Sequence, residues 1–258
     1  MTIVLNEHEW AKNMIDSRSL GKKPSETLCR VARYYIDKKY SKKDVRRALN
    51  TFLLQCDPTA PLPKWVGTID RAMSRAFKRN ALEIDCIHIT KPEMEAIKKI
   101  QGRQPQRLAF TLLCLAKYWD LLNSSGDHWV NSKDNEIMKM ANINTSIKRQ
   151  SALFRTLNEL GLIQFSKKVD NTNVRVCFMA DGDPVMDVSD FRNLGYQYQK
   201  FCGEPFYKCE NCGIVSKIPD PVKGRKVKYC KDCAKEVQLQ QIVNSAMRRQ
   251  ANKTHASV

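Results

Sequence analysis

Two Cys-x-x-Cys pairs constrain the structure of this chain more than any other feature of its sequence. The first pair is Cys209 and Cys212, and the second is Cys230 and Cys233. Two cysteines at this spacing can turn both thiolates toward one ion, and two such pairs supply the four ligands of a tetrahedral site. The spacing therefore predicts a zinc ribbon over residues 201–236, with Zn²⁺ as its cofactor.

Four thiolates leave no open coordination position, so the expected role of the metal is structural. Redox-active dithiols are the alternative, but they would need a thioredoxin-like setting, which is absent. Residues 213–229, between the pairs, predict a β-hairpin. Cys202 could replace a ligand, although we expect it to be structural. In a reducing compartment the cysteines outside the pairs are expected to be small core residues: Cys29, Cys56, Cys86, Cys114, Cys177 and Cys202.

The charge of the chain points to a polyanionic partner. Its 258 residues include 44 Lys plus Arg against 27 Asp plus Glu, a net charge of +17 with a pI of about 9.5. Nucleic acid is the expected partner, because each phosphate that a cation neutralises releases a counterion. An anionic membrane surface and an acidic protein are the alternatives.

We expect a cytoplasmic protein that does not bind membranes. No segment reaches the roughly 18 consecutive apolar residues of a membrane span. The first seven residues also lack the basic and apolar regions of a secretory signal peptide.

Residues 1–82 are predicted to form a basic helical domain. Apolar residues recur at helical spacing after Pro24, after Ser41 and after Lys64. From residue 21 to residue 80 there are 15 Lys plus Arg and 5 Asp plus Glu, so more than half of the net charge lies here. Like charges one helical turn apart repel, which favours a polyanion partner over a solvated surface. The cations concerned are Lys42, Lys43, Arg46 and Arg47.

Residues 83–200 give the clearest indication of a fold. The pattern predicts an apolar helix over 107–123, a short extended piece at 129–130 and a helix around Ile137. A tight turn, a helix over 145–160 and a β-hairpin over 162–179 follow. This is the order of elements in a winged helix-turn-helix domain. The run from Leu157 to Ile163 resembles the end of a recognition helix that leads into the first wing strand.

The resemblance implies a DNA-reading face on the helix over 145–160. Ile147, Phe154, Leu157 and Leu160, with Leu153 as a further candidate, are expected to be its apolar side. The polar side contains Thr145, Ser146, Lys148, Arg149 and Arg155. Arginine is the residue type that pairs bidentately with guanine, which makes Arg149 the candidate for base contact. Cations of the wing would contact the DNA backbone or minor groove: Lys167, Lys168 and Arg175. The alternative is a winged helix that binds protein.

The predicted ribbon also carries cations suited to phosphate contact: Lys223, Arg225, Lys226 and Lys228. A pure stability clip and a protein-contact surface are the alternatives. Residues 237–258 are expected to form a basic helical tail.

The sequence does not predict an enzyme, and no residue is assigned a catalytic role. The four histidines lack metal-hydrolase spacing, and no Gly-x-Ser-x-Gly motif is present. Glu93, Glu95 and Lys98 could form a nuclease-like set, but charges on an exposed helix explain them better.

The expected fold is therefore mainly α with small β elements: a helical N-terminal region, a winged helix-turn-helix domain, a four-cysteine zinc ribbon and a basic helical tail. This layout, with Tyr229 to Ala234 leading into a basic helix, resembles DNA-binding proteins of phages and integrated mobile elements. The resemblance implies sequence- or structure-directed binding of duplex DNA, in replication initiation or transcription regulation. Two alternatives stay open. One is an adaptor or inhibitor of a large protein or ribonucleoprotein machine, and the other is an RNA-binding factor, although RRM and KH signatures are absent.

Overall fold

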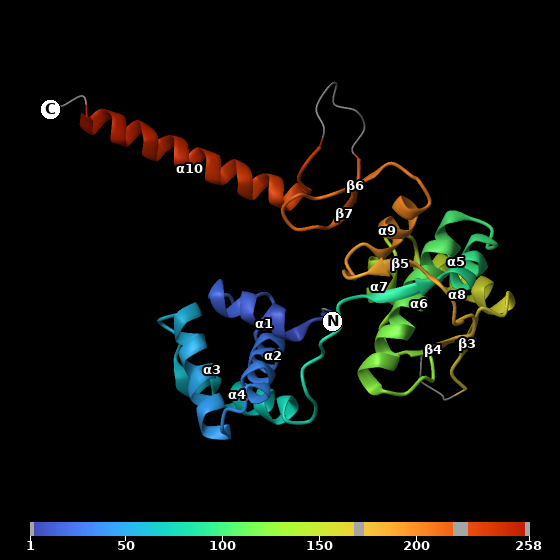
Figure 1. Ribbon diagram of the computed structural model, residues 1–258, viewed down its shortest axis with the longest axis horizontal. Helices are drawn as coiled ribbons and strands as arrows, with labels where there is room; N and C mark the ends of the chain where they lie inside the picture. Colours follow the sequence, from blue (N-terminus) through green and yellow to red (C-terminus); the bar gives the residue numbers. More distant parts are fainter. Residues whose placement is uncertain (1–2, 168–172, 219–226, 256–258) are drawn as a thin grey trace. The chain divides into compact units, whose positions relative to one another are not determined.

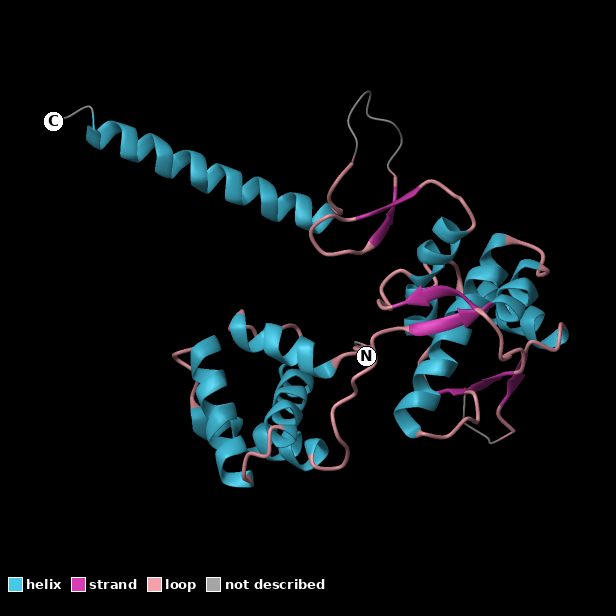
Figure 2. Ribbon diagram, in the orientation of Figure 1, coloured by secondary structure: helices cyan, strands magenta, loops and turns pink. Residues whose placement is uncertain are grey.

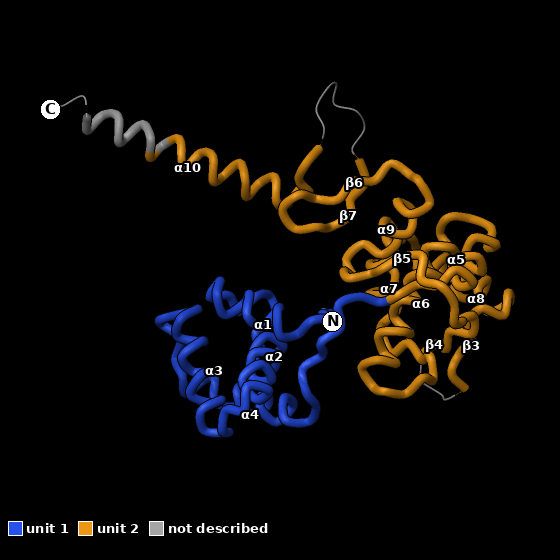
Figure 3. The backbone as a smooth tube through the Cα atoms, in the orientation of Figure 1, with its two compact units in different colours: residues 1–87 blue, residues 88–258 orange. Residues whose placement is uncertain are grey.

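The computed structural model describes residues 3–167, 173–218 and 227–255, and this part of the chain is mainly helical with small sheets (Figures 1 and 2). The chain forms two compact units, residues 1–87 and 88–258 (Figure 3). The expected fold class is thus confirmed at the level of a mainly helical protein with small β elements.

Unit 1 is helical, and side chains cap its first and third helices, whereas its second and fourth helices begin at Lys23 and Pro61 without a side-chain cap. Asn6 accepts a hydrogen bond from the Glu9 amide at 2.8 Å, and Ser41 accepts one from the Asp44 amide at 3.2 Å. The four helices are α1 (Glu7–Asp16), α2 (Pro24–Asp37), α3 (Lys42–Cys56) and α4 (Leu62–Ala76).

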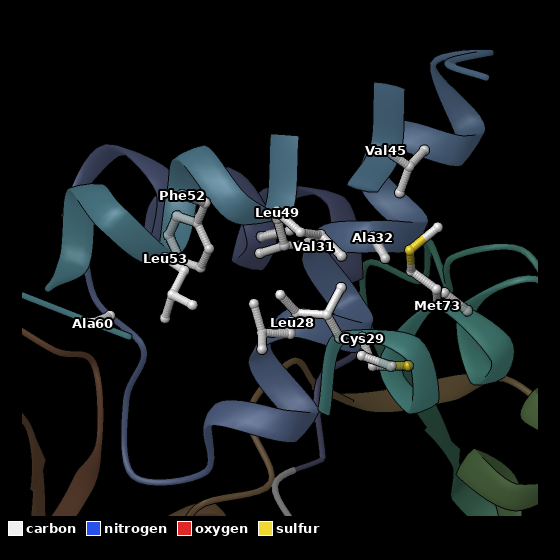
Figure 4. Packing of buried hydrophobic residues seen from close by; sticks show 14 residues of the cluster. Leu28, Cys29, Val31, Ala32, Val45, Leu49, Phe52, Leu53, Ala60 and Met73 are labelled. Atoms are coloured by element: carbon white, nitrogen blue, oxygen red, sulfur yellow. The ribbon is translucent and has the colours of Figure 1, made fainter. Parts of the chain in front are cut away.

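The core of unit 1 is built around α2, which packs against α1, α3 and α4. Leu28 and Val31 of α2 meet Leu49 and Leu53 of α3, and all four side chains are fully buried (Figure 4). Burial of one such side chain stabilises the fold by about 1.5–3 kcal/mol.

The buried carboxylate of Glu7, near the start of unit 1, forms hydrogen bonds with residues near its end. Arg33 Nη1 donates to both carboxylate oxygens of Glu7 at 2.6 and 2.8 Å. The two terminal nitrogens of Arg79 donate at 3.0 and 2.9 Å, and the Leu82 amide donates at 3.1 Å. Arg30 Nε lies 3.5 Å from Oε1. The Glu7 side chain is 3% exposed, so these partners replace its hydration.

Unit 2 is organised around a long central helix, α6. The strands of this part of the chain are β1 (Ile87–Thr90), β2 (Trp129–Val130), β3 (Ile163–Phe165), β4 (Val174–Val176), β5 (Pro184–Val188), β6 (Phe206–Lys208) and β7 (Val215–Lys217). The helices are α5 (Lys91–Lys98), α6 (Arg103–Asn123), α7 (Asp134–Met140), α8 (Ile147–Glu159), α9 (Leu194–Phe201) and α10 (Lys231–His255). Residues 108–116 and Tyr118 of α6 are buried, as its apolar composition predicts, whereas Leu121 near its end is 50% exposed. Helices α5, α7, α8 and α9 all pack against α6.

A three-stranded antiparallel sheet lies beside α6 and α8. Its strand order is β2-β4-β3, with Val174 of β4 opposite both Val130 and Phe165. The chain enters the sheet by β2, leaves it through α7 and α8, and returns by β3 and β4. The other sheets are the pairs β1-β5 and β6-β7.

Glycine is required at residue 195, where α9 crosses the end of α7. A Cβ atom there would overlap the carbonyl oxygen of Ala141 and lie 2.6 Å from its carbonyl carbon. Because backbone cannot give way cheaply, we expect Gly195→Ala to lower the free energy of unfolding by about 2–3 kcal/mol. Chemical denaturation of the full chain would measure the change.

Gly67 provides the matched control for that substitution. It lies within α4, and no atom would come within 4 Å of an added Cβ. Gly67→Ala should therefore stabilise the protein by about 0.5–1 kcal/mol through helix propensity. Equal effects of the two substitutions would contradict the close approach at residue 195.

Candidate metal centre and nucleic-acid interface

The cysteines of the two pairs come together into one site. One sulfur atom from each of Cys209, Cys212, Cys230 and Cys233 lies within 4.8 Å of all the others. The Cys212 and Cys230 sulfurs are 3.6 Å apart, and none of the four cysteines forms a disulfide. Tetrahedral bonds of roughly 2.3 Å place neighbouring sulfurs about 3.8 Å apart, so the cluster has the size of a four-thiolate metal site.

The first cysteine pair occupies the turn of the β6-β7 hairpin. Lys208 of β6 is opposite Val215 of β7, and Gly213 adopts a positive φ of 72° directly after the pair. The Cys209 amide donates to Ile214 O at 2.9 Å, which closes the turn. The described strands β6 and β7 flank the first pair, while the hairpin expected over residues 213–229 falls partly on residues that are not described. Residues 219–226 lie outside the described residues.

The second cysteine pair lies at the start of α10. Its Cys230 amide donates to the Cys209 sulfur at 3.2 Å, and the Tyr207 hydroxyl donates to the Tyr229 carbonyl at 3.1 Å. These contacts join the start of α10 to the β6-β7 hairpin, and Cys209 lies 21 residues before Cys230 in the chain. Backbone amides directed at sulfur are typical of sites that hold thiolates.

The pKa values of Cys209 and Cys233 are shifted in opposite directions. Burial raises the pKa of Cys209, but amide donors from Cys212, Cys230 and Asn211 outweigh burial and lower it to about 6. The Asn211 side chain lowers the pKa of Cys233, while burial and the adjacent thiols raise it more, to about 12. The amide donors around Cys209 thus favour its thiolate, the form in which a cysteine binds a metal ion.

The cysteine cluster is anchored to α9 by polar and aromatic contacts. Arg192 donates to the Cys212 carbonyl at 2.6 Å, and the Asn193 side-chain amide donates to the Val215 carbonyl at 2.9 Å. The rings of Tyr196 and Phe206 have centroids 4.9 Å apart. The position of the hairpin in unit 2 thus depends on tertiary contacts as well as on the cysteines.

Helix α8 presents an exposed cationic side. Lys148, Arg149 and Arg155 are exposed, and no ion pair is found for them within the described part of the chain. Ser146 caps the helix by accepting from the Arg149 amide, at 3.4 Å, and Thr145 just before it is half-buried.

The apolar side of α8 is narrower than expected. Leu153, Phe154 and Leu157 are buried, but Ile147 is 81% exposed and Leu160 is 55% exposed. Side chains of a helix lean toward its N-terminus, so Ile147 in the first turn extends beyond the core that the later residues reach.

The expected wing residues are only partly described. Arg175 is exposed on β4, opposite Gln164 of β3, and Lys167 is exposed just after β3. Lys168 lies outside the described residues. Of the expected ribbon cations, Lys228 is exposed with its ammonium 3.8 Å from Glu210, and Lys223, Arg225 and Lys226 lie outside the described residues.

Two of the four cations on α3 have acidic partners, which the like-charge spacing along the chain does not indicate. Arg46 forms an ion pair with Asp70 of α4, and Arg47 lies 3.4 Å from Asp44. Lys42 and Lys43 are exposed, and no ion pair is found for them among the residues the structure describes. All four stay candidates for phosphate contact, because surface ion pairs such as those of Arg46 and Arg47 are weak.

Three other expectations need correction. Cys29 and Cys114 are buried as expected, but Cys177 and Cys202 are exposed, and Cys202 is not part of the cluster.

Glu93 is not an exposed helix charge. It is fully buried, closes a capping box by accepting from the Thr90 amide at 2.8 Å, and pairs with Lys117 at the same distance. The capping pattern was visible in the sequence, whereas Lys117 lies 24 residues further on and no local pattern indicates it.

Comparison of the chain with protein-family models, with curated proteins and with solved structures gave no match. Within the described ranges, no helix has both the length and the apolar character needed to cross a membrane.

Proposed function

We propose that this chain is a non-enzymatic, duplex-DNA-binding protein whose residues 105–180 form a winged helix and whose cysteine cluster holds Zn²⁺. The observation that carries the proposal is the combination of sheet order β2-β4-β3 with the helix order α6, α7, α8. In winged-helix proteins this arrangement leaves the third helix free to enter the major groove.

The exposed positive charge on α8 also supports binding of duplex DNA by this helix. Lys148, Arg149 and Arg155 are exposed on one short helix, and the carboxylates of the described residues do not neutralise them. A helix that enters the major groove needs cations for phosphates and a planar guanidinium for guanine. The four-cysteine cluster supports Zn²⁺ as the bound metal, because Zn²⁺ in structural sites is commonly held by four thiolates.

Arg149→Ala tests the proposed base contact. We expect the substitution to relax sequence preference in selection from a random duplex library, and to weaken binding to the selected duplex by about 1–3 kcal/mol. Fluorescence anisotropy of the zinc-loaded full chain, at several salt concentrations, measures both the affinity and its salt dependence.

Lys99→Ala is the control, since Lys99 is exposed in the same unit at the end of α5. It should leave the affinity for the selected duplex nearly unchanged. Equal behaviour of the Arg149 and Lys99 variants, with an unchanged selected sequence, would refute the proposed base contact.

A protein adaptor is the second candidate, and α10 favours it. Leu239, Ile242 and Met247 of this helix are 64%, 60% and 63% exposed, at spacings that place apolar side chains along one side. Weak, salt-insensitive binding of the chain to duplex DNA, single strands and RNA hairpins alike would support this candidate over DNA binding.

A further inference from the structure

Unit 1 contains a row of three tyrosine rings at the end of α2. The centroids of Tyr34 and Tyr35 are 5.4 Å apart at an interplanar angle of 78°, and those of Tyr35 and Tyr40 are 5.2 Å apart at 53°. Tyr34 and Tyr35 are half-buried, and Tyr40 is 47% exposed. With Lys38 and Lys39 they form what we call the tyrosine–lysine surface.

Local backbone geometry explains how Tyr40 reaches this row. The helix ends at Asp37, Lys39 adopts a left-handed φ of 66°, and the Tyr40 amide donates to the Tyr35 carbonyl at 3.2 Å. This is a Schellman-type closure, which commonly brings an apolar side chain back onto the last turn. An aliphatic residue at position 40 would satisfy this closure equally well. The closure therefore does not explain why an aromatic ring with about half of its surface exposed lies there.

Lys38 lies against the Tyr34 ring of this row. Lys38 Nζ lies 4.2 Å from the centroid of the Tyr34 ring and donates to its hydroxyl at 2.6 Å. Lys39 is exposed beside it, and the chain continues into the exposed Lys42 and Lys43. For these four lysines, no ion pair with a carboxylate is found in the described ranges.

The acidic residues next to these lysines already have partners. Asp37 accepts from the Ala81 amide at 3.0 Å and lies 2.9 Å from His8 Nε2. Asp44 accepts from the Ser41 hydroxyl at 2.6 Å and lies 3.4 Å from Arg47. Four exposed lysines lie within three residues of the exposed Tyr40 ring in the chain.

We infer that the tyrosine–lysine surface, together with Lys42 and Lys43, binds single-stranded nucleic acid, with a base stacked on Tyr40 and the lysines on the phosphates. Stacked base pairs hide their faces inside a duplex, so an exposed ring can stack only on an unpaired base. This ligand and this site are both distinct from the α8 contact with duplex DNA, and they do not depend on it.

Tyr40→Ala and Tyr40→Phe, made in the full zinc-loaded chain, test the stacking. Fluorescence anisotropy with labelled dT20 and rU20 would measure binding. We expect Tyr40→Ala to weaken binding roughly 5- to 150-fold, the range of one lost base–aromatic stack. Tyr40→Phe keeps the ring and should bind within about twofold of the wild type. A lower Kd for dT20 assigns the surface to DNA, and a lower Kd for rU20 assigns it to RNA.

The lysines give a second readout that does not depend on Tyr40. Lys42→Ala and Lys43→Ala should each lower the slope of log K against log salt by about 0.7 on single strands. Arg149→Ala separates this inference from the proposed function, because it should impair duplex binding and leave dT20 and rU20 binding intact. Wild-type affinity of Tyr40→Ala, or equal losses in the alanine and phenylalanine variants, would overturn the inference.

Discussion

Replacing Cys209 with serine is expected to abolish high-affinity metal binding and to unfold the segment from β6 to the first turn of α10. Few apolar groups support this segment, since its buried cluster consists of cysteines with Ile214 and Tyr229 packed against them. Metal binding contributes about 10–16 kcal/mol to small four-ligand sites at neutral pH, so the fold of such a segment depends on it. Loss of one ligand should lower affinity by more than the roughly 10–100-fold that loss of a second-shell partner costs.

Elemental analysis of the purified chain would give the metal content, with one zinc per wild-type chain expected. Limited proteolysis would show new cleavage between residues 201 and 236 in the variant. Cys202→Ser is the matched control, because Cys202 is exposed, lies outside the cluster and is close in sequence. Full zinc content in the Cys209 variant, or equal loss in the Cys202 variant, would exclude the assigned ligand set.

Glu7→Gln is expected to destabilise unit 1 by about 3–5 kcal/mol. The substitution removes the negative charge from a buried site and leaves Arg33 and Arg79 facing a neutral amide. Breaking one partner of a buried charge pair leaves the other charge without compensation, which is the source of this cost. Hydrogen–deuterium exchange of peptides from residues 3–87, followed against urea concentration, reports the stability of unit 1 within the full chain.

Glu9→Gln is the control for Glu7, because Glu9 lies in the first turn of the same helix and is exposed. It should change the stability of unit 1 by less than about 0.5 kcal/mol. If Glu7→Gln also changes the free energy of unfolding of unit 1 by less than about 0.5 kcal/mol, the Glu7 carboxylate does not stabilise the contacts between α1, α2 and residue 82.

The same carboxylate predicts how unit 1 responds to acid. Burial raises the pKa of Glu7, but the hydrogen bonds and charges of Arg79 and Arg33 outweigh burial, so its pKa is below the usual 4.5. A lowered pKa in the folded state means that the carboxylate stabilises unit 1 fully above pH 4.5, and that this contribution disappears as the pH falls through the lowered value. Glu7→Gln should therefore remove part of the acid sensitivity of unit 1.

Features set by near neighbours in the chain could be predicted from the sequence. Asn6, Ser41, Thr90 and Ser146 all act as helix caps, because a side-chain oxygen accepts from an amide about three residues ahead whatever surrounds the helix. The hairpin β6-β7 around the first cysteine pair was not predicted, because the short strand Phe206–Lys208 gives a weaker sequence signal than the turn residues between the pairs.

The sequence by itself determined the four-cysteine site, the helical character of the chain and its basic charge. Cysteine spacing and helical periodicity are local patterns, and net charge is a property of the whole composition, so none of the three depends on how the helices pack. Only the tertiary structure decided which charges are available. It paired Arg46 with Asp70, and it buried Glu7 and Glu93 against cations distant in sequence. It also left Ile147 exposed and brought Tyr34, Tyr35 and Tyr40 into one row. Such outcomes depend on which surfaces meet when the helices pack, and residues that meet in this way need share no local pattern.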